Sequence, residues 1–204
     1  MTDIAILPLA LTVMLGPQIL VGMLLITRKD PIKSSLVYSL AILSTLILTT
    51  YLYYSLVKIT GLHLASVGSR PMIKPFLIAL FIFLIIRSIL NRNKITEPPK
   101  WMKGVLSASL SKIFIIGLCL IAFMPTDVAV TFTVGSLLNS ESIPFVSAWP
   151  FFGAVLLISF LPLTIYFSLG SNGSKYLEKI NNWLNTHGFV INVVVLIFFI
   201  FLLL

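Results

Sequence analysis

The sequence predicts an all-α integral membrane protein with six transmembrane helices. Of its 204 residues, 58% are hydrophobic and only 10% are charged, a composition outside the range of soluble domains. Because a helix rises about 1.5 Å per residue and the hydrocarbon core is about 30 Å thick, roughly 20 apolar residues make one crossing. Several uncharged runs reach that length, and lysine and arginine cluster in alternate loops between them.

The helices of the first half are expected at 4–27, 34–57 and 71–90. The first run is apolar from its start, but Asp3 precedes it and no basic residue does, so we interpret it as a mature helix rather than a cleaved signal peptide. The second run carries no charge. The third carries Lys74 and Arg87 near its ends, where long cationic side chains can reach the membrane interface.

The helices of the second half are expected at 110–138, 142–174 and 180–204. As one straight rod, the fourth helix would measure about 43 Å and exceed the bilayer, so it must tilt, bend or break. A polar cytoplasmic linker divides the chain into a first half 1–90, the linker 91–104 and a second half 105–204. The segment 171–183 is expected to form a loop followed by a short amphipathic helix on the inner surface.

The distribution of positive charge predicts which side of the membrane each loop faces. Ten of the fourteen lysines and arginines lie in the loops after the first, third and fifth helices, and three lie in the loop after the second. Basic residues are retained on the cytoplasmic side. We therefore expect a multi-pass protein of the cytoplasmic membrane with both termini outside. Its net charge of +8 then reflects topology and attraction to lipid headgroups, and no nucleic acid is expected as a partner.

Two prolines near the middle of apolar segments predict matching helix breaks. Pro17 follows Gly16 in the first helix, and Pro125 lies 108 residues later in the fourth. Proline frees backbone groups that, inside a membrane, only protein or water can satisfy, so the breaks should face each other near the midplane. Because each half has three helices, an odd number, the two halves enter the membrane from opposite sides. They would therefore form two inverted three-helix repeats. A simple kink is the alternative reading of Pro17.

Polar residues beside these breaks are the candidate substrate-binding residues. Asp127 is the most informative, because a central carboxylate costs about 2.5–3.5 kcal/mol on insertion scales and calls for a partner or a watery cavity. Alternatively, it caps the second half of a broken helix. Lys112 would guide an anionic headgroup from the inner side, or only reach the interface. The full set is Gly16, Pro17, Gln18, Lys112, Pro125, Thr126, Asp127 and Thr131.

Catalytic, metal and redox chemistry are not expected. Cys119 is the only cysteine, which excludes a paired-thiol site. His63 and His187 stand alone in the sequence, unlike metal ligands, and no nucleophile with a positioned base is visible. We therefore expect no enzyme, no metal and no cofactor. Of the function classes considered, a transporter is favoured, and an accessory membrane subunit is the alternative. A homo-oligomer is possible in either case.

Several short motifs together resemble a known family. They are Leu7-Pro8-Leu9-Ala10-Leu11 with Gly16-Pro17, the basic loop 28–33, Pro125 followed by 128–133, Pro162, and Trp183-Leu184 with His187. Over most of its length, the chain resembles the sulfolipid-addressing or peptidoglycolipid-addressing proteins, small six-helix transporters of the lysine exporter superfamily. Such relatives often have an asparagine before the helix-four proline and a basic residue after it, whereas this chain has Met124 and Thr126-Asp127.

The resemblance implies a function and a set of partners. It implies export or flipping of a lipid, a glycolipid or another anionic amphiphile, with membrane lipids around the protein. The wider superfamily includes exporters of amino acids and metal ions, so a small-solute exporter is the alternative.

Overall fold

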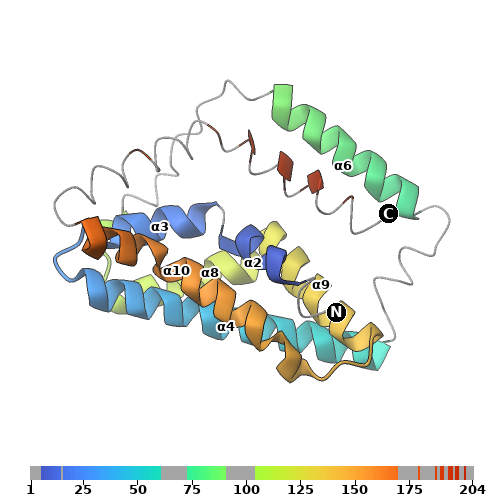
Figure 1. Ribbon diagram of the computed structural model, residues 1–204, viewed down its shortest axis with the longest axis horizontal. Helices are drawn as coiled ribbons and strands as arrows, with labels where there is room; N and C mark the ends of the chain where they lie inside the picture. The colour runs from blue at the N-terminus through green and yellow to red at the C-terminus, as the bar shows by residue number, and fades with distance from the viewer. Residues whose placement is uncertain are drawn as a thin grey trace.

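The computed structural model describes residues 6–14, 16–60, 73–90 and 104–169, with scattered positions between 179 and 200. These residues form helices and turns with no strand among them, which confirms the all-helical class for this part of the chain (Figure 1). The elements are α2 (Leu7–Met14), α3 (Pro17–Leu25), α4 (Pro31–Thr60), α6 (Ile73–Leu90), η1 (Gly104–Ser107), α8 (Leu110–Phe123), α9 (Pro125–Ser140), η2 (Phe145–Ala148) and α10 (Trp149–Leu169).

Other expectations lie outside the described residues. These are the linker 91–103, the amphipathic helix at 171–183 and, apart from single positions, the last helix at 180–204.

Two to four of the described segments can cross a membrane. The helix α4 and the segment Phe145–Ser168, which consists of η2 and all but the last residue of α10, are each long and apolar enough alone. The pairs α2 with α3 and α8 with α9 reach that length only together, bent by 65° and 67° respectively. The break expected in the fourth helix is therefore confirmed.

The local sequence explains both breaks. Pro17 and Pro125 occupy the first turn of α3 and α9, where the missing proline N–H costs no hydrogen bond. Before Pro17, Gly16 has a φ of 136°, a backbone conformation that a β-carbon would strain. Before Pro125, Met124 is extended, as the residue preceding a proline prefers. Each helix therefore stops and restarts at its proline.

The longest helix, α4, is the surface against which α8 and α9 pack. A β-carbon added at Gly117 of α8 would lie 2.9 Å from Ala41, and one added at Gly135 of α9 would lie 2.7 Å from the backbone nitrogen of Tyr54. Such close approach through small residues is typical of membrane helices. Because Gly117 meets the first half of α4 and Gly135 meets its second half, the broken helix α8–α9 runs parallel to α4.

The helix α10 lies along α4 in the opposite direction (Figure 1). Phe145, in the turn before α10, packs edge-on against Tyr51 near the end of α4, with ring centroids 5.3 Å apart. Further along α10, the Ser159 hydroxyl bonds the Ser39 hydroxyl of α4 at 2.9 Å. Apolar side chains of α2, α4, α9 and α10 fill the core between these helices.

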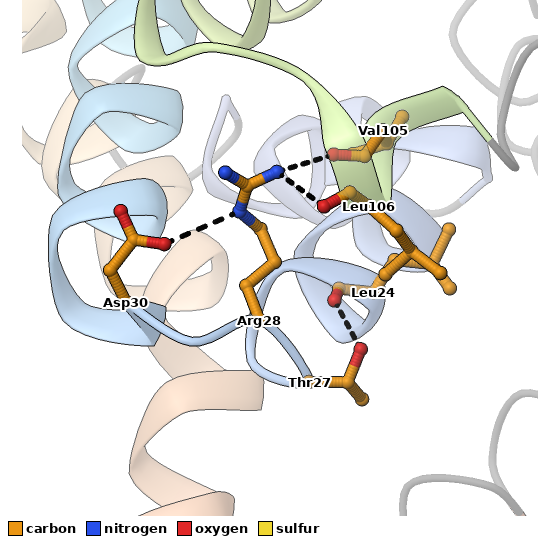
Figure 2. Close-up of polar contacts among 6 residues, drawn as sticks. All are labelled: Leu24, Thr27, Arg28, Asp30, Val105 and Leu106. Atoms are coloured by element: carbon orange, nitrogen blue, oxygen red, sulfur yellow. Dashed lines mark hydrogen bonds and ion pairs between the residues drawn. The ribbon is translucent and has the colours of Figure 1, made fainter.

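An arginine in the loop after α3 forms hydrogen bonds to the start of the second half (Figure 2). The Nη1 atom of Arg28 donates hydrogen bonds to the carbonyl oxygens of Val105 at 2.7 Å and Leu106 at 2.8 Å. The Asp30 carboxylate lies 3.6 Å from the Nε atom of Arg28. The loop that follows the first broken helix therefore lies beside the segment that leads into the second.

The helix α6 lies apart from this bundle, beside the described positions near the C-terminus (Figure 1). The Ser88 hydroxyl of α6 bonds the Phe189 carbonyl oxygen at 3.5 Å.

Candidate functional site

The two helix breaks meet through a glutamine and an aspartate. The side-chain amide of Gln18, in the first turn of α3, donates a hydrogen bond to Oδ2 of Asp127, in the first turn of α9. The same amide nitrogen lies 3.4 Å from the sulfur of Met124. Gln18 is 1% exposed and Asp127 is fully buried. The expected meeting of the two breaks is confirmed, and their depth in the bilayer stays a prediction.

The helix α4 adds a tyrosine that sequence reasoning missed. The hydroxyl of Tyr38 donates to the backbone carbonyl oxygen of Gln18 at 2.8 Å, and Tyr38 is buried. This bond fixes the start of α3 against α4, so it also sets the position of the Gln18 side chain. The available signal was a single phenol in the apolar first half of α4, because buried tyrosine hydroxyls usually find a partner.

Thr131 lies one turn after Asp127 and is buried beneath it. Its hydroxyl donates to the backbone carbonyl oxygens of Asp127 at 2.8 Å and Val128 at 3.1 Å. A threonine that bonds its own helix in this way satisfies its proton locally and keeps an acceptor lone pair. The hydrogen bonds of the Thr131 hydroxyl therefore stay within α9, although the side chain is fully buried.

The Asp127 carboxylate has little electrostatic compensation. The first turn of α9 favours a negative charge through the helix dipole, but the hydrogen bond that Asp127 accepts comes from Gln18 and its other oxygen has no partner, so Asp127 does not cap the backbone amides of α9. No lysine or arginine among the described residues forms an ion pair with Asp127. Its Oδ1 atom and the Oε1 atom of Gln18 are both buried without a hydrogen-bond partner. One hydrogen bond thus joins two groups that each retain a buried acceptor.

The other predicted site residues divide into two sets. Gly16 and Pro17 are half-buried beside Gln18, whereas Pro125 and Thr126 are exposed on the outer side of the second break. Lys112 is exposed in the first turn of α8, about 20 Å along the helix axis from the break. The structure therefore brings together Gly16, Pro17, Gln18, Asp127 and Thr131 and leaves Lys112 apart.

The arrangement offers polar contacts. Within the described part of the chain, no group of three or more histidine, cysteine, aspartate or glutamate residues could hold a metal ion. A carboxylate, a carboxamide and a phenol can bind hydroxyl groups or ions by hydrogen bonds and charge. These groups suit recognition of a polar cargo.

Comparison with curated proteins and with solved structures finds no match. A family model does match, and its description reads Sap, sulfolipid-1-addressing protein. The match covers residues 6–204 and so includes both broken helices and every predicted site residue. The chain is a helical membrane protein and belongs to the family of sulfolipid-1-addressing proteins.

Proposed function

We propose that the protein exports or flips an anionic lipid, of the sulfated glycolipid class, across the cytoplasmic membrane. The observation that carries this proposal is the buried hydrogen bond between Gln18 and Asp127, which joins two broken helices inside an apolar bundle. Transporters expose helix ends and freed backbone groups to their cargo at such breaks. The family description, which refers to sulfolipid addressing, supports a lipid cargo.

The surface beside the second break supports a lipid over a small solute. Phe123 is 76% exposed, and the neighbouring Pro125 and Thr126 are exposed too, so the break has an outward, apolar side. Acyl chains could stay in the bilayer along this side while sugar hydroxyls donate to the acceptors of Gln18 and Asp127, which are buried here and become accessible only when the two breaks separate. A sulfate would be held further inward, near Lys112. A small-solute exporter, the alternative, would instead hold its cargo in a closed aqueous pocket.

We also propose the six-span topology of the lysine exporter superfamily. The parallel course of α4 and α8–α9 requires one return across the membrane between residues 61 and 109, and α6, at 18 residues, can make a crossing of about 27 Å. The packing supports inverted repeats. The second helix of the first half, α4, contacts the broken helix α8–α9 of the second half, and the corresponding helix of the second half, α10, contacts the broken helix α2–α3 of the first half. Basic loops would then face the cytoplasm, with both termini outside.

Lipid movement can be tested in proteoliposomes that contain a fluorescent sulfated glycolipid, with a membrane-impermeant quencher added outside. The wild-type protein should speed the exposure of the inner-leaflet lipid. Asp127→Asn should slow it by about 10–100-fold, because hydrogen bonds to charged groups contribute about 1.5–3 kcal/mol. Glu141→Gln, the same chemical change at the exposed end of α9, is the matched control and should keep the wild-type rate.

Two results would contradict this reasoning in different ways. A wild-type protein that does not speed lipid exposure would refute the lipid proposal and favour the small-solute exporter or an accessory membrane subunit. An Asp127→Asn variant that is folded and fully active would leave Asp127 with a structural role and remove the main support for this site.

The topology can be tested by cysteine labelling in intact cells. Cys119 is exposed on α8, so it is first replaced by serine, and single cysteines are then introduced at 91–103. An impermeant maleimide added outside should leave these positions unlabelled until the membrane is opened. Labelling in sealed cells would reverse the proposed orientation.

A further inference from the structure

The acceptors at the two breaks exceed the donors that reach them. The Gln18 amide supplies one hydrogen bond to Oδ2 of Asp127, while Oδ1 of Asp127 and Oε1 of Gln18 are buried with no partner. Gln18 is 1% exposed and Asp127 0% exposed, so bulk water does not reach these oxygens. Pro125 also lacks the N–H that would bond the Ile121 carbonyl oxygen of α8, whereas the Leu120 carbonyl oxygen still accepts from the Met124 N–H. Oxygen atoms therefore predominate where the two helices meet.

No charged side chain balances Asp127 from the helices packed around it. The α2 segment, Leu7–Met14, has no ionisable residue, and α8 has Lys112 and Cys119, both exposed. From α4, the group that faces the site is the Tyr38 hydroxyl, which donates to the Gln18 carbonyl oxygen. A buried carboxylate without a cationic partner is costly, and a small cation that binds there removes this cost.

We infer that Asp127 and Gln18 form a binding site for one monovalent cation, a proton or Na⁺, at the meeting of the two helix breaks. Carboxylate, carboxamide and backbone carbonyl oxygens are the ligands that hard cations prefer. A proton would instead bind one carboxylate oxygen. The inference deepens the proposed transport function, on which its coupling role rests.

Occupancy of this site would change the contact between the two halves of the chain. A hydrogen bond to an ionised carboxylate is roughly twice as strong as one between neutral groups. When a proton neutralises Asp127, the Gln18 amide is held less firmly, and the start of α3 can separate from the start of α9; when the proton leaves, the contact tightens again. A sodium ion bound by both side chains would instead hold the two helix starts together. Cation binding and the relative position of the two broken helices are thereby linked.

The cation can be tested on the purified full-length protein in detergent, without lipid cargo. The unfolding temperature is measured in sodium chloride and in choline chloride at equal ionic strength. Infrared difference spectra between acid and alkaline pH are recorded in parallel to follow protonated carboxyl groups. The variants are Asp127→Asn, Gln18→Met, which keeps the side-chain length without the amide, and Glu141→Gln as the exposed carboxyl control.

If the site binds sodium, the unfolding temperature of the wild type and of Glu141→Gln should be about 2–4 °C higher in sodium chloride than in choline chloride. Asp127→Asn should lose this difference. A proton site predicts no sodium effect and a carboxyl band that Asp127→Asn alone abolishes. If Asp127→Asn does not fold, Gln18→Met decides the matter: it should reduce the sodium shift or move the carboxyl band.

Three results separate the outcomes of the inference from those of the proposed function. The cation site is overturned if the wild type shows neither a sodium shift nor an Asp127-dependent carboxyl band. It is also overturned if the Gln18→Met variant behaves identically to the wild type. Lipid flipping that proceeds in a protein without cation binding overturns the inference and leaves the proposed function standing. Cation binding in a protein that does not move lipid supports the inference and refutes the proposed function.

Discussion

Replacing Gly135 by alanine should destabilise the bundle by a measurable amount. The added β-carbon would lie 2.7 Å from the backbone nitrogen of Tyr54 and 3.0 Å from the backbone oxygen of Thr50. Ordinary contact begins near 3.4 Å, and these atoms belong to the α4 backbone, so the two helices must move apart. Overpacking costs about 1–3 kcal/mol, whereas alanine in place of glycine within a helix contributes about 0.5–1 kcal/mol in favour. We expect a net loss of about 1 kcal/mol, within a range of about 0–2.5 kcal/mol.

The matched control is Gly153→Ala in α10, where an added β-carbon meets nothing within 4 Å. It should stabilise the protein by the helix-propensity gain alone. Unfolding of the purified variants in detergent would be followed by tyrosine and tryptophan fluorescence. At about 2–4 °C per kcal/mol, Gly135→Ala should unfold several degrees below the wild type and Gly153→Ala slightly above it. If Gly135→Ala is as stable as Gly153→Ala, the close packing of α9 on α4 is not as described.

Two further predictions concern polar contacts between the halves. Arg28→Ala should lower the free energy of unfolding by about 1.5–3 kcal/mol, because charged hydrogen bonds to the Val105 and Leu106 carbonyl oxygens are lost. Arg28→Lys should lower it by less, since lysine keeps the charge but lacks the forked donor geometry. Equal stability of all three proteins would contradict this. In a double-mutant cycle, Ser39→Ala and Ser159→Ala should show a coupling of about 0.6 kcal/mol, the average for membrane hydrogen bonds; additive effects would mean that the hydroxyl contact contributes nothing.

The positions of the breaks could be predicted from sequence, and their contacts could not. Proline lacks a backbone donor wherever it stands, and the helices do break at Pro17 and Pro125. The effect is not automatic, because Pro162 lies inside α10 without ending that helix. The hydrogen-bond partner of Asp127 could not be predicted, because Gln18 lies 109 residues away and several other polar side chains could have made the same bond. A carboxylate predicts that some partner exists without indicating which.

The packing of α4 was equally hidden. Small polar residues line the buried side of α4 and leucines line its exposed side, as is typical of packed membrane helices, but this stripe does not indicate which helix packs against it. The close approach at Gly117 and Gly135 and the bond from Tyr38 depend on the rotation of each helix about its axis. Arg28 shows a related limit: its charge predicted the side of the membrane, but not its bonds to the segment before α8.

The link between Gln18 and Asp127 also affects how the chain is made. Synthesis delivers about 5–20 residues per second, so the 109 residues between the two partners take about 5–20 s to appear. During this interval, the first broken helix enters the membrane without the aspartate that its glutamine binds. Its freed backbone groups must be satisfied by water or by the insertion machinery. The contact that joins the two breaks can therefore form only after the chain has been made as far as Asp127.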